Sequence, residues 1–469
     1  MISVKNLSLT LEEKEVFSGI SFDVSAESFF LIKGRSGSGK SLILQALAGM
    51  IPEVVKGEVS GSVSIGDKNP VDEGVVGMSG DVGYMMQDAD SQLCTFSVKD
   101  EILFGMENLN LPKEEMTTRM NDVLRLFQIE DLRHRSISEL SGGQKQKVCF
   151  AALYAMNPQV FLLDEPTANL DPDSAREIIA IAKMLVREEG KTVLIVEHNH
   201  GYIKDDVDGL YDLDNRHLVT DGVAEYIESY IHNYELPPID FPPGEKVILS
   251  GKNISFSYGD LNVLKDISLD LREGEILAIA GKSGSGKSTL ANLLSGLVRA
   301  PAKAIEIDGK DLSKLNTMAM GETVGLVFQN PEHQFIKYTV WDELALGLVT
   351  RHYDSDAITE HVEASLVAFR LVEKKDANPY ELSQGEKRKL STASMLITGQ
   401  KVLILDEPTY GQDRENLIHL LELLYKVARE KVGIILISHD PELVTRCCHR
   451  ALWMTDGRLV PYERGEAHG

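Results

Sequence analysis

The chain carries one sequence pattern twice, and this internal repeat restricts its fold more than any other feature. The segment that starts at Asn6 aligns without a gap with the segment that starts at Asn253, at an offset of 247 residues. The same offset relates two glycine-rich loops, which start at Gly34 and Gly281. Later motifs recur at offsets of 242 or 241, and we expect a longer surface loop within 58–80 of the first copy to account for the change. The sequence therefore predicts two copies of one domain.

The two copies meet near a proline-rich segment. Four prolines between 237 and 243 interrupt any regular element there. We therefore expect a first domain over 1–223, a linker over 224–246 and a second domain over 247–469. Each copy alternates short apolar runs with helix-prone segments, which predicts the α/β class with a core of buried parallel strands. A polar stretch between 111 and 141 predicts a helical subdomain.

Composition argues against several classes of protein. The formal net charge is −24, whereas proteins that bind nucleic acid usually carry a basic surface, so we expect no nucleic-acid partner. The four cysteines show neither a zinc spacing nor a disulfide framework, which favours reduced thiols. No run of 18 apolar residues occurs and the start lacks a signal peptide, so we expect at most a peripheral role at a membrane.

Both glycine-rich loops fit the pattern G-x-x-x-x-G-K-[ST], and each follows an apolar run and precedes a helix-prone segment. Glycines allow the backbone N–H groups to surround a phosphate. Lys40 and Lys287 are predicted to reach the β- and γ-phosphates of ATP, and Ser41 and Ser288 to hold Mg²⁺. The predicted phosphate-binding residues are Gly34, Arg35, Ser36, Gly37, Ser38, Gly39, Lys40 and Ser41 in the first copy, and Gly281, Lys282, Ser283, Gly284, Ser285, Gly286, Lys287 and Ser288 in the second.

A pair of acidic residues ends an apolar run in each copy. Asp164 and Asp406 are placed to reach the metal ion, and the adjoining Glu165 and Glu407 to polarise the attacking water. The alternative is that these acids only cap the following helix. The Asp-Glu-Pro-Thr motif recurs at the same position in both copies, which favours the catalytic role.

Two further segments, ELSGGQKQK and ELSQGEKRK, open a helix with serine and glycine. Such a helix start can bind an anion, but at this second site no lysine of the same domain is placed to bind the phosphate. We therefore expect each segment to serve a nucleotide held by the other copy. The residues that we expect to do so are Ser141, Gly142 and Gly143 in the first segment, and Ser383 and Gly385 in the second.

With every motif present twice, the chain resembles ABC-type ATPases over essentially its whole length. The resemblance implies two tandem P-loop domains, each with a parallel-sheet core, an antiparallel β portion and a helical subdomain. It also implies two composite ATP sites, with His198 and His439 as catalytic histidines and Asp171 and Asp413 in the loop that crosses between domains. One site joins Lys40, Gln87, Asp164, Glu165 and His198 to Ser383 and Gly385, and the other joins Lys287, Gln329, Asp406, Glu407 and His439 to Ser141, Gly142 and Gly143. The implied metal ligands are Ser41, Gln87 and Asp164 in the first copy, and Ser288, Gln329 and Asp406 in the second.

The segments after Gln87 and Gln329 resemble the energy-coupling-factor branch of this family, whose members power uptake of vitamins and metal ions. The resemblance implies a cytoplasmic, peripheral ATPase bound to a transmembrane coupling protein and a substrate-binding membrane protein. We expect 88–105 and 330–347 to receive them. Core packing is the alternative role for the apolar side chains of these segments, which are Phe96, Phe335, Tyr338 and Trp341.

Two other functions stay open, namely the tandem ATPase of a sugar importer and a ribosome-associated translation factor. The stretch 221–246 has six acidic residues and one lysine, which argues against RNA.

The copies differ at three motif positions. Tyr258 stands where the family stacks a ring on adenine, whereas the first copy has Leu11. Gln384 and Glu386 alter the second signature. All three changes fall on the composite site of Lys40, so we predict unequal sites, with the charge of Glu386 opposing closure unless Lys387 or Arg388 compensates it.

Overall fold

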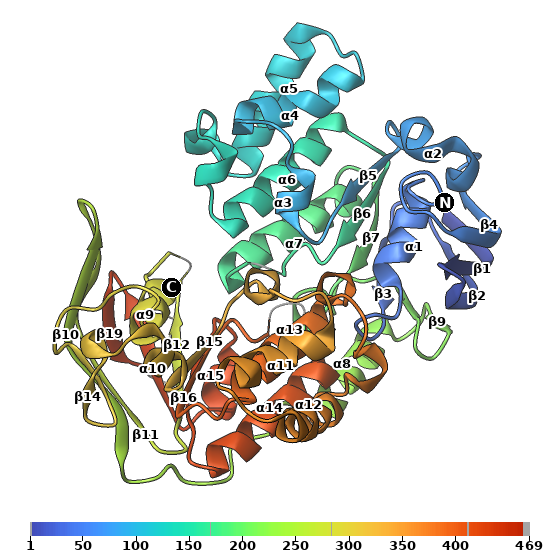
Figure 1. Cartoon of the computed structure of the whole chain (residues 1–469). Helices are drawn as coiled ribbons and strands as arrows, with labels where there is room; N and C mark the ends of the chain where they lie inside the picture. The colour runs from blue at the N-terminus through green and yellow to red at the C-terminus, as the bar shows by residue number, and fades with distance from the viewer. Residues whose placement is uncertain (1, 169, 283, 410–411, 463–469) are drawn as a thin grey trace. The chain divides into compact units, whose positions relative to one another are not determined.

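The computed structural model describes residues 2–168, 170–282, 284–409 and 412–462. The chain divides into two compact units, Met1–Asn233 and Tyr234–Gly469. Figure 1 shows both units, each with its own sheets and helices. The segment 224–246, predicted as a linker, is divided between them. Its first part continues helix α8 (Val223–Asn233) of the first unit, and Leu236 is buried in the core of the second.

The first unit begins with an antiparallel sheet in the order β2-β1-β4. Its alternating burial is typical of strands with one face on a core, and Ile2, Val4 and Phe22 pack inward. The strands are β1 (Ile2–Leu11), β2 (Lys14–Val24) and β4 (Glu58–Ile65). The expected surface loop within 58–80 is therefore wrong for much of its length, because this segment forms β4 and helix α2 (Pro70–Met78), which Asn69 caps.

The second sheet of this unit has the order β5-β6-β7-β3-β8-β9, and all of its pairs are parallel except β8 with β9. Strands β3, β6 and β7 are apolar and fully buried, as expected for a sheet that is covered on both faces. The strands are β3 (Phe29–Lys33), β5 (Val82–Met85), β6 (Val160–Asp164), β7 (Thr192–Val196), β8 (Gly209–Asp212) and β9 (His217–Val219). The carboxyl ends of the parallel strands meet at one edge, where the predicted site residues follow them.

Helices complete the first unit. The predicted helical subdomain forms around Met120, Phe127 and Phe150, which share one buried cluster. Helix α1 (Lys40–Leu47) precedes α2. The α-helices after α2 are α3 (Ala89–Gln92), α4 (Val98–Asn108), α5 (Lys113–Leu126), α6 (Gly142–Met156) and α7 (Pro172–Arg187). Short 3₁₀ turns are formed by Glu130–Leu132, Ile137–Glu139 and His200–Tyr202.

The second unit repeats this plan. Its antiparallel sheet has the order β11-β10-β13-β14, and its six-stranded sheet has the order β15-β16-β17-β12-β18-β19. The strands are β10 (Val247–Tyr258), β11 (Leu261–Arg272), β12 (Ile276–Gly281), β13 (Ile305–Ile307), β14 (Lys310–Asp311), β15 (Val324–Val327), β16 (Val402–Asp406), β17 (Gly433–Ile437), β18 (Arg450–Thr455) and β19 (Arg458–Pro461). The α/β class with two repeated domains is thereby confirmed.

The helices of the second unit follow the same order as those of the first. They are α9 (Lys287–Leu294), α10 (Thr317–Gly321), α11 (Val340–Thr350), α12 (Ser355–Ala368), α13 (Gln384–Leu396), α14 (Arg414–Arg429) and α15 (Pro441–Arg446). The 3₁₀ turns are Leu312–Lys314, Pro331–Gln334, Val372–Lys374 and Pro379–Glu381. Within the described residues, no helix combines the length and the apolar character needed to cross a membrane. All four cysteines are free thiols, and Cys94 alone among them is exposed.

Candidate functional site

The first glycine loop connects β3 to α1 and is built on backbone conformations that favour glycine. Gly37 and Gly39 have φ of 79° and 93°. A Cβ on Gly39 would lie 2.8 Å from the ring of Phe17, so a side chain does not fit there. Lys40 is buried, and its Nζ donates to the carbonyls of Gly34 and Arg35, both at 2.8 Å. The loop and the start of α1 thus gather backbone N–H groups and one ammonium group, which is the chemistry that binds phosphate.

The second loop, between β12 and α9, repeats this geometry. Gly284 and Gly286 have φ of 78° and 107°. The Nζ of Lys287 donates to the carbonyls of Gly281 at 2.7 Å and Lys282 at 2.8 Å. Ser283, which was predicted to belong to this loop, lies outside the described residues.

Each sheet brings an aspartate to its glycine loop. Asp164 ends β6 beside the hydroxyl of Ser41, and Asp406 ends β16 beside that of Ser288. Burial, with the adjoining Glu165, raises the pKa of Asp164 to about 7. Burial also raises the pKa of Asp406 to about 6, against the hydrogen bond from Ser288. Burial therefore destabilises the ionised form of both carboxylates, and a nearby cation would stabilise it.

These residues fit Mg²⁺ bound together with a nucleotide. The Oδ1 of Asp164 is buried and has no hydrogen-bond partner among the described residues, which leaves it free to ligate a cation. No cluster of three or more His, Cys, Asp and Glu exists in the described part of the chain that could hold a metal by itself. Mg²⁺ commonly takes one or two protein oxygens and completes its shell with phosphate and water. One carboxylate and one hydroxyl in each copy match that requirement.

The predicted water-activating glutamates lie next to these aspartates. Glu165 and Glu407 have φ of 47° and 49°, a left-handed conformation that is uncommon outside glycine. Glu165 Oε1 lies 2.9 Å from Nε2 of His198, and Glu407 Oε1 lies 2.9 Å from Nδ1 of His439. The structure therefore pairs each glutamate with its predicted histidine.

The second oxygen of these glutamates differs between the copies. Gln87 Nε2 donates to Glu165 Oε2 at 2.7 Å, whereas Glu407 Oε2 is buried without a hydrogen-bond partner in the described residues. Although burial opposes the charge, His198, Lys40 and Gln87 together lower the pKa of Glu165. In the second copy, burial is outweighed by Glu407, which raises the pKa of His439.

Each predicted signature segment forms the start of a helix. Ser141 caps α6 and Ser383 caps α13, and each is part of a capping box with the residue three positions later. Glu386 Oε2 accepts from the backbone N–H of Ser383 at 2.9 Å, and its Oε1 lies 3.4 Å from Nζ of Lys374. The compensation by Lys387 or Arg388 that the sequence left open is not seen in these contacts, because Lys387 pairs with Glu332 and Arg388 with backbone carbonyls.

Comparison with known proteins identifies these motifs. Residues 17–168 and 264–410 match the ABC transporter family. The chain belongs to this family. It is accordingly an ATP-binding, ATP-hydrolysing transport protein with two ABC ATPase domains, as the sequence predicted.

Two relatives match almost the whole chain. A protein of Bacillus subtilis (strain 168), named as an HMP/thiamine import ATP-binding protein, is 37% identical over 98% of this chain and 91% of its own length. A Treponema denticola protein, named as an ABC transporter ATP-binding protein, is 32% identical over 99% of this chain and 98% of its own length. Among solved structures, cbiO1 of Clostridium perfringens, part of the ABC transporter complex cbiONQ, is 31% identical, covers 46% of this chain and 88% of its own, and has a TM-score of 0.43.

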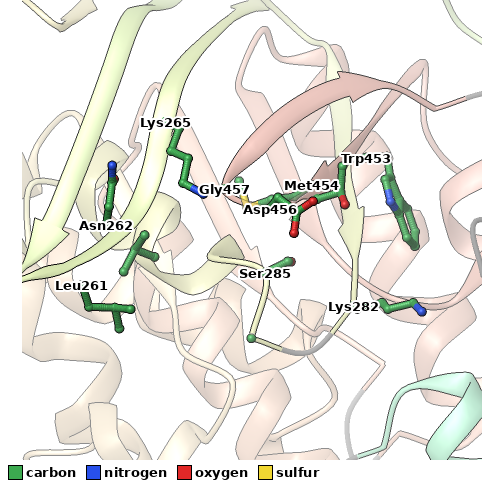
Figure 2. A pocket seen from close by; sticks show the side chains of 12 residues that line it. Leu261, Asn262, Lys265, Lys282, Ser285, Trp453, Met454, Asp456 and Gly457 are labelled. Atoms are coloured by element: carbon green, nitrogen blue, oxygen red, sulfur yellow. The ribbon is translucent and has the colours of Figure 1, made fainter.

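A cavity of about 470 Å³ lies beside the second glycine loop of this ABC ATPase (Figure 2). Side chains from β11, among them Leu261 and Lys265, line it together with Ser285 of the loop and Asp456 of the β18–β19 hairpin. The predicted adenine-stacking ring, Tyr258, ends the neighbouring strand β10 and is 49% exposed. Leu11 at the equivalent place packs instead against the apolar core of the first unit.

The predicted docking segments divide into buried and exposed side chains. Phe335 is buried in a cluster of the helical subdomain, and Trp341 packs against that cluster. The prediction that Phe335 faces a partner is therefore wrong, because its ring is buried in this cluster and lies edge-on to the ring of Tyr380. By contrast, Phe96 is 90% exposed and Tyr338 is 85% exposed.

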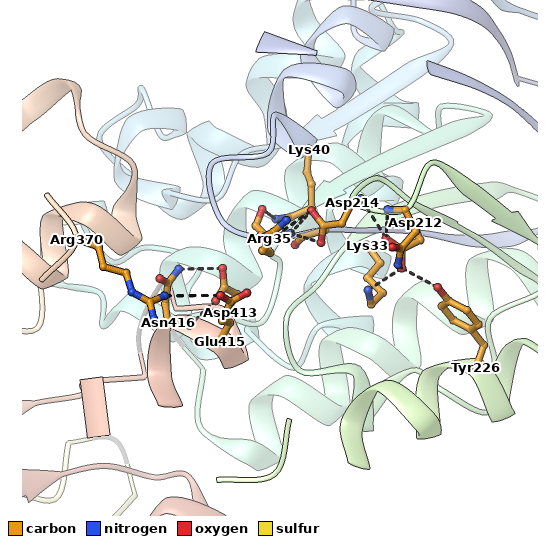
Figure 3. A network of polar contacts seen from close by, with 12 residues as sticks. Lys33, Arg35, Lys40, Asp212, Asp214, Tyr226, Arg370, Asp413, Glu415 and Asn416 are labelled. Carbon is orange, nitrogen blue, oxygen red and sulfur yellow. Dashed lines mark hydrogen bonds and ion pairs between the residues drawn. The ribbon is translucent and has the colours of Figure 1, made fainter. Parts of the chain in front are cut away.

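Sequence reasoning missed a polar network around the first glycine loop (Figure 3). Asp214 accepts from the backbone N–H of Arg35 at 3.0 Å, and the buried Lys33 donates to Asp212 at 2.9 Å. Asp212 also accepts from the hydroxyl of Tyr226 on α8 at 2.8 Å. The lysine at the end of the otherwise apolar strand FFLIK was the signal that could have found it. In the second unit, Figure 3 shows Asp413 capping α14, where it accepts from the backbone N–H of Asn416 at 2.7 Å; its predicted role between domains stays a prediction.

Proposed function

We propose that this chain is the ATP-hydrolysing subunit of an energy-coupling-factor importer, which takes up a vitamin or a metal ion through separate membrane subunits. The observation that carries the proposal is the B. subtilis relative, which matches 98% of this chain and is named for HMP/thiamine import. Since specificity in such systems lies in another polypeptide, the proposal names a class of solute only. The chain would act as a peripheral protein at the cytoplasmic face of the membrane.

Exposed apolar side chains support a membrane partner. Phe96, Ile336 and Tyr338 follow the glutamine loops and expose 90%, 71% and 85% of their surface. Large apolar side chains that are exposed on a surface can mark interaction sites, and each unit has such side chains directly after its glutamine. We assign these side chains, within 88–105 and 330–347, to the docking of helices from the transmembrane coupling protein.

The chemistry would run at two composite sites. In each, the glycine loop would hold the phosphates and the signature of the other copy would close on them. Ser41, Gln87 and Asp164, and equally Ser288, Gln329 and Asp406, would hold Mg²⁺, which neutralises phosphate charge when bound. Glu165 or Glu407 would accept a proton from the attacking water. His198 or His439 would hold the carboxylate of that glutamate in place.

The proposal is tested by isolating the chain with its membrane partners and identifying the small molecule that copurifies. Reconstituted in liposomes, the complex should take up that molecule only with ATP. The triple variant F96S/I336S/Y338S should lose the membrane partners and keep its ATPase activity in solution. Val76→Ser and Leu297→Ser, which change exposed apolar side chains outside the docking segments, are the matched controls. ATP-independent uptake, or partners retained by the triple variant, would contradict the proposal.

A further inference from the structure

Among the described residues, the largest fully buried side chain is a cation. Arg388 lies on α13, five residues after the cap Ser383, and is 0% exposed. Its Nη1 donates to the carbonyls of Phe328 at 2.6 Å and Asp406 at 3.4 Å. Its Nη2 donates to the carbonyls of Gln329 at 2.6 Å and Glu407 at 3.1 Å. One guanidinium thus joins the signature helix to two other segments.

Those two segments carry groups that act on ATP. Gln329 begins the glutamine loop after β15, and Glu407 follows β16 as the water-activating residue. The planar guanidinium has donors in a fixed fork, so it holds several carbonyls in one geometry, which a lysine cannot do. A displacement of 1 Å in a catalytic group can cost about 100-fold in rate. Fixing the peptide groups of Gln329 and Glu407 therefore fixes where their side chains begin.

The first copy lacks this brace. Its equivalent residue, Gln146, is also buried, and its amide donates to the carbonyl of Glu165 at 3.4 Å, which is a long and weak hydrogen bond. In this copy the side chain of Gln87 donates a hydrogen bond to Glu165 Oε2, whereas Glu407 Oε2 accepts no hydrogen bond from the described residues. The brace and the free carboxylate oxygen occur in the same copy.

We propose that Arg388 is a positioning residue for ATP hydrolysis at the Lys287 site. It ties the glutamine loop and the end of β16 to the signature helix at a fixed spacing, so that Gln329 stays available to the cation and Glu407 Oε2 to the attacking water. Arg388 itself touches neither and acts through the backbone. This inference rests on the roles proposed above for Gln329 and Glu407.

The test replaces Arg388 in the full-length chain by glutamine, the residue of the first copy, and separately by lysine. R388Q should lower kcat about tenfold and change the KM for ATP less than twofold, since the glycine loop is untouched. The Mg²⁺ concentration for half-maximal rate should rise, because Gln329 is displaced. R388K keeps the charge without the fork and should lie between R388Q and the wild type. Gln146→Ala, at the equivalent position, should change kcat less than twofold.

Three outcomes would overturn the proposal. One is a kcat and Mg²⁺ requirement of R388Q within twofold of the wild type. Another is a loss of ATP binding and thermal stability equal in R388Q and R388K, which would make Arg388 a structural brace only. If R388Q does not fold, R388K decides, and wild-type kcat and Mg²⁺ dependence in that variant would show that the fork is not needed.

Discussion

The two copies hold their glutamine loops through different contacts. In the second copy, Gln334 donates to the carbonyl of Ser391 and to the hydroxyl of Ser394, both at 2.9 Å, so the loop is attached to α13. In the first copy, the equivalent Gln92 turns back and accepts from Met86 N–H of its own loop at 2.9 Å.

Charged contacts strengthen the contrast. Both copies have an ion pair between loop and signature helix, Lys145 with Asp90 and Lys387 with Glu332. The second copy adds the guanidinium of Arg388, whereas the first has Gln146. Two domains with the same fold and motifs therefore hold the equivalent loop through different contacts. We infer that the second copy is organised for hydrolysis and the first for slower turnover or regulation.

The comparison of the two copies assumes that neither copy hydrolyses ATP efficiently by itself. Separating the chain between Asn233 and Tyr234, where the two units divide, should leave halves that bind ATP but hydrolyse it about 100-fold more slowly, because each site lacks the signature of the other copy. Mixing the halves should restore part of the rate. Full activity in a half shown to be monomeric by light scattering would contradict the composite sites.

Where the copies are alike, mutations should have equal effects. A Cβ on Gly39 would lie 2.8 Å from Phe17, and one on Gly286 would lie 2.9 Å from Leu264, both at positive φ. Gly39→Ala and Gly286→Ala should each destabilise their unit by about 2 kcal/mol. Chemical denaturation should show two similar shifts. A shift in only one unit would mean that the loops are not structurally equivalent. The exposed Gly309→Ala, at positive φ without a close contact, is the control for backbone strain alone.

The aromatic ring at the nucleoside side should matter only in the second copy. Tyr258→Leu removes an aromatic contact of about 0.5–1.5 kcal/mol, so ATP should bind the Lys287 site up to about tenfold more weakly. Leu11→Tyr should strengthen binding at the Lys40 site by a smaller factor. Titration of a fluorescent ATP analogue measures both constants. An unchanged constant in Tyr258→Leu would show that the ring, which is half exposed, does not contact the base.

The smallest effect is expected for the altered signature. Lys374 and Glu386 lie 3.4 Å apart and are 35% and 25% exposed, so their ion pair is partly screened. Lys374→Ala should leave the second unit folded, with a loss of at most about 1 kcal/mol in unfolding free energy, and should lower ATPase activity less than twofold. A larger loss of activity at unchanged stability would show that the uncompensated charge of Glu386 opposes closure of the Lys40 site, as the sequence alone suggested.

The repeated motifs made the fold and the positions of the candidate site residues predictable, because strand, glycine loop and helix are local in sequence. Lys40, Asp164 and Glu165 belong to short segments whose geometry follows from their own residues. The partners of Arg388 were not predictable, since they depend on how α13 packs against the ends of β15 and β16. Phe335 illustrates the same limit: an apolar side chain in a loop reads equally as docking surface or core until the fold places it.

The unequal role of the two sites is tested most directly by comparing Glu407→Gln with Glu165→Gln in the steady-state ATPase assay. Both substitutions keep the shape of the side chain and remove the charge that we propose accepts a proton from water. The braced loop and the free Oε2 of Glu407 predict that Glu407→Gln abolishes most hydrolysis, about 100-fold, while Glu165→Gln leaves a measurable remainder. Equal losses would contradict the asymmetry and would mean that the two sites hydrolyse ATP together or in strict alternation.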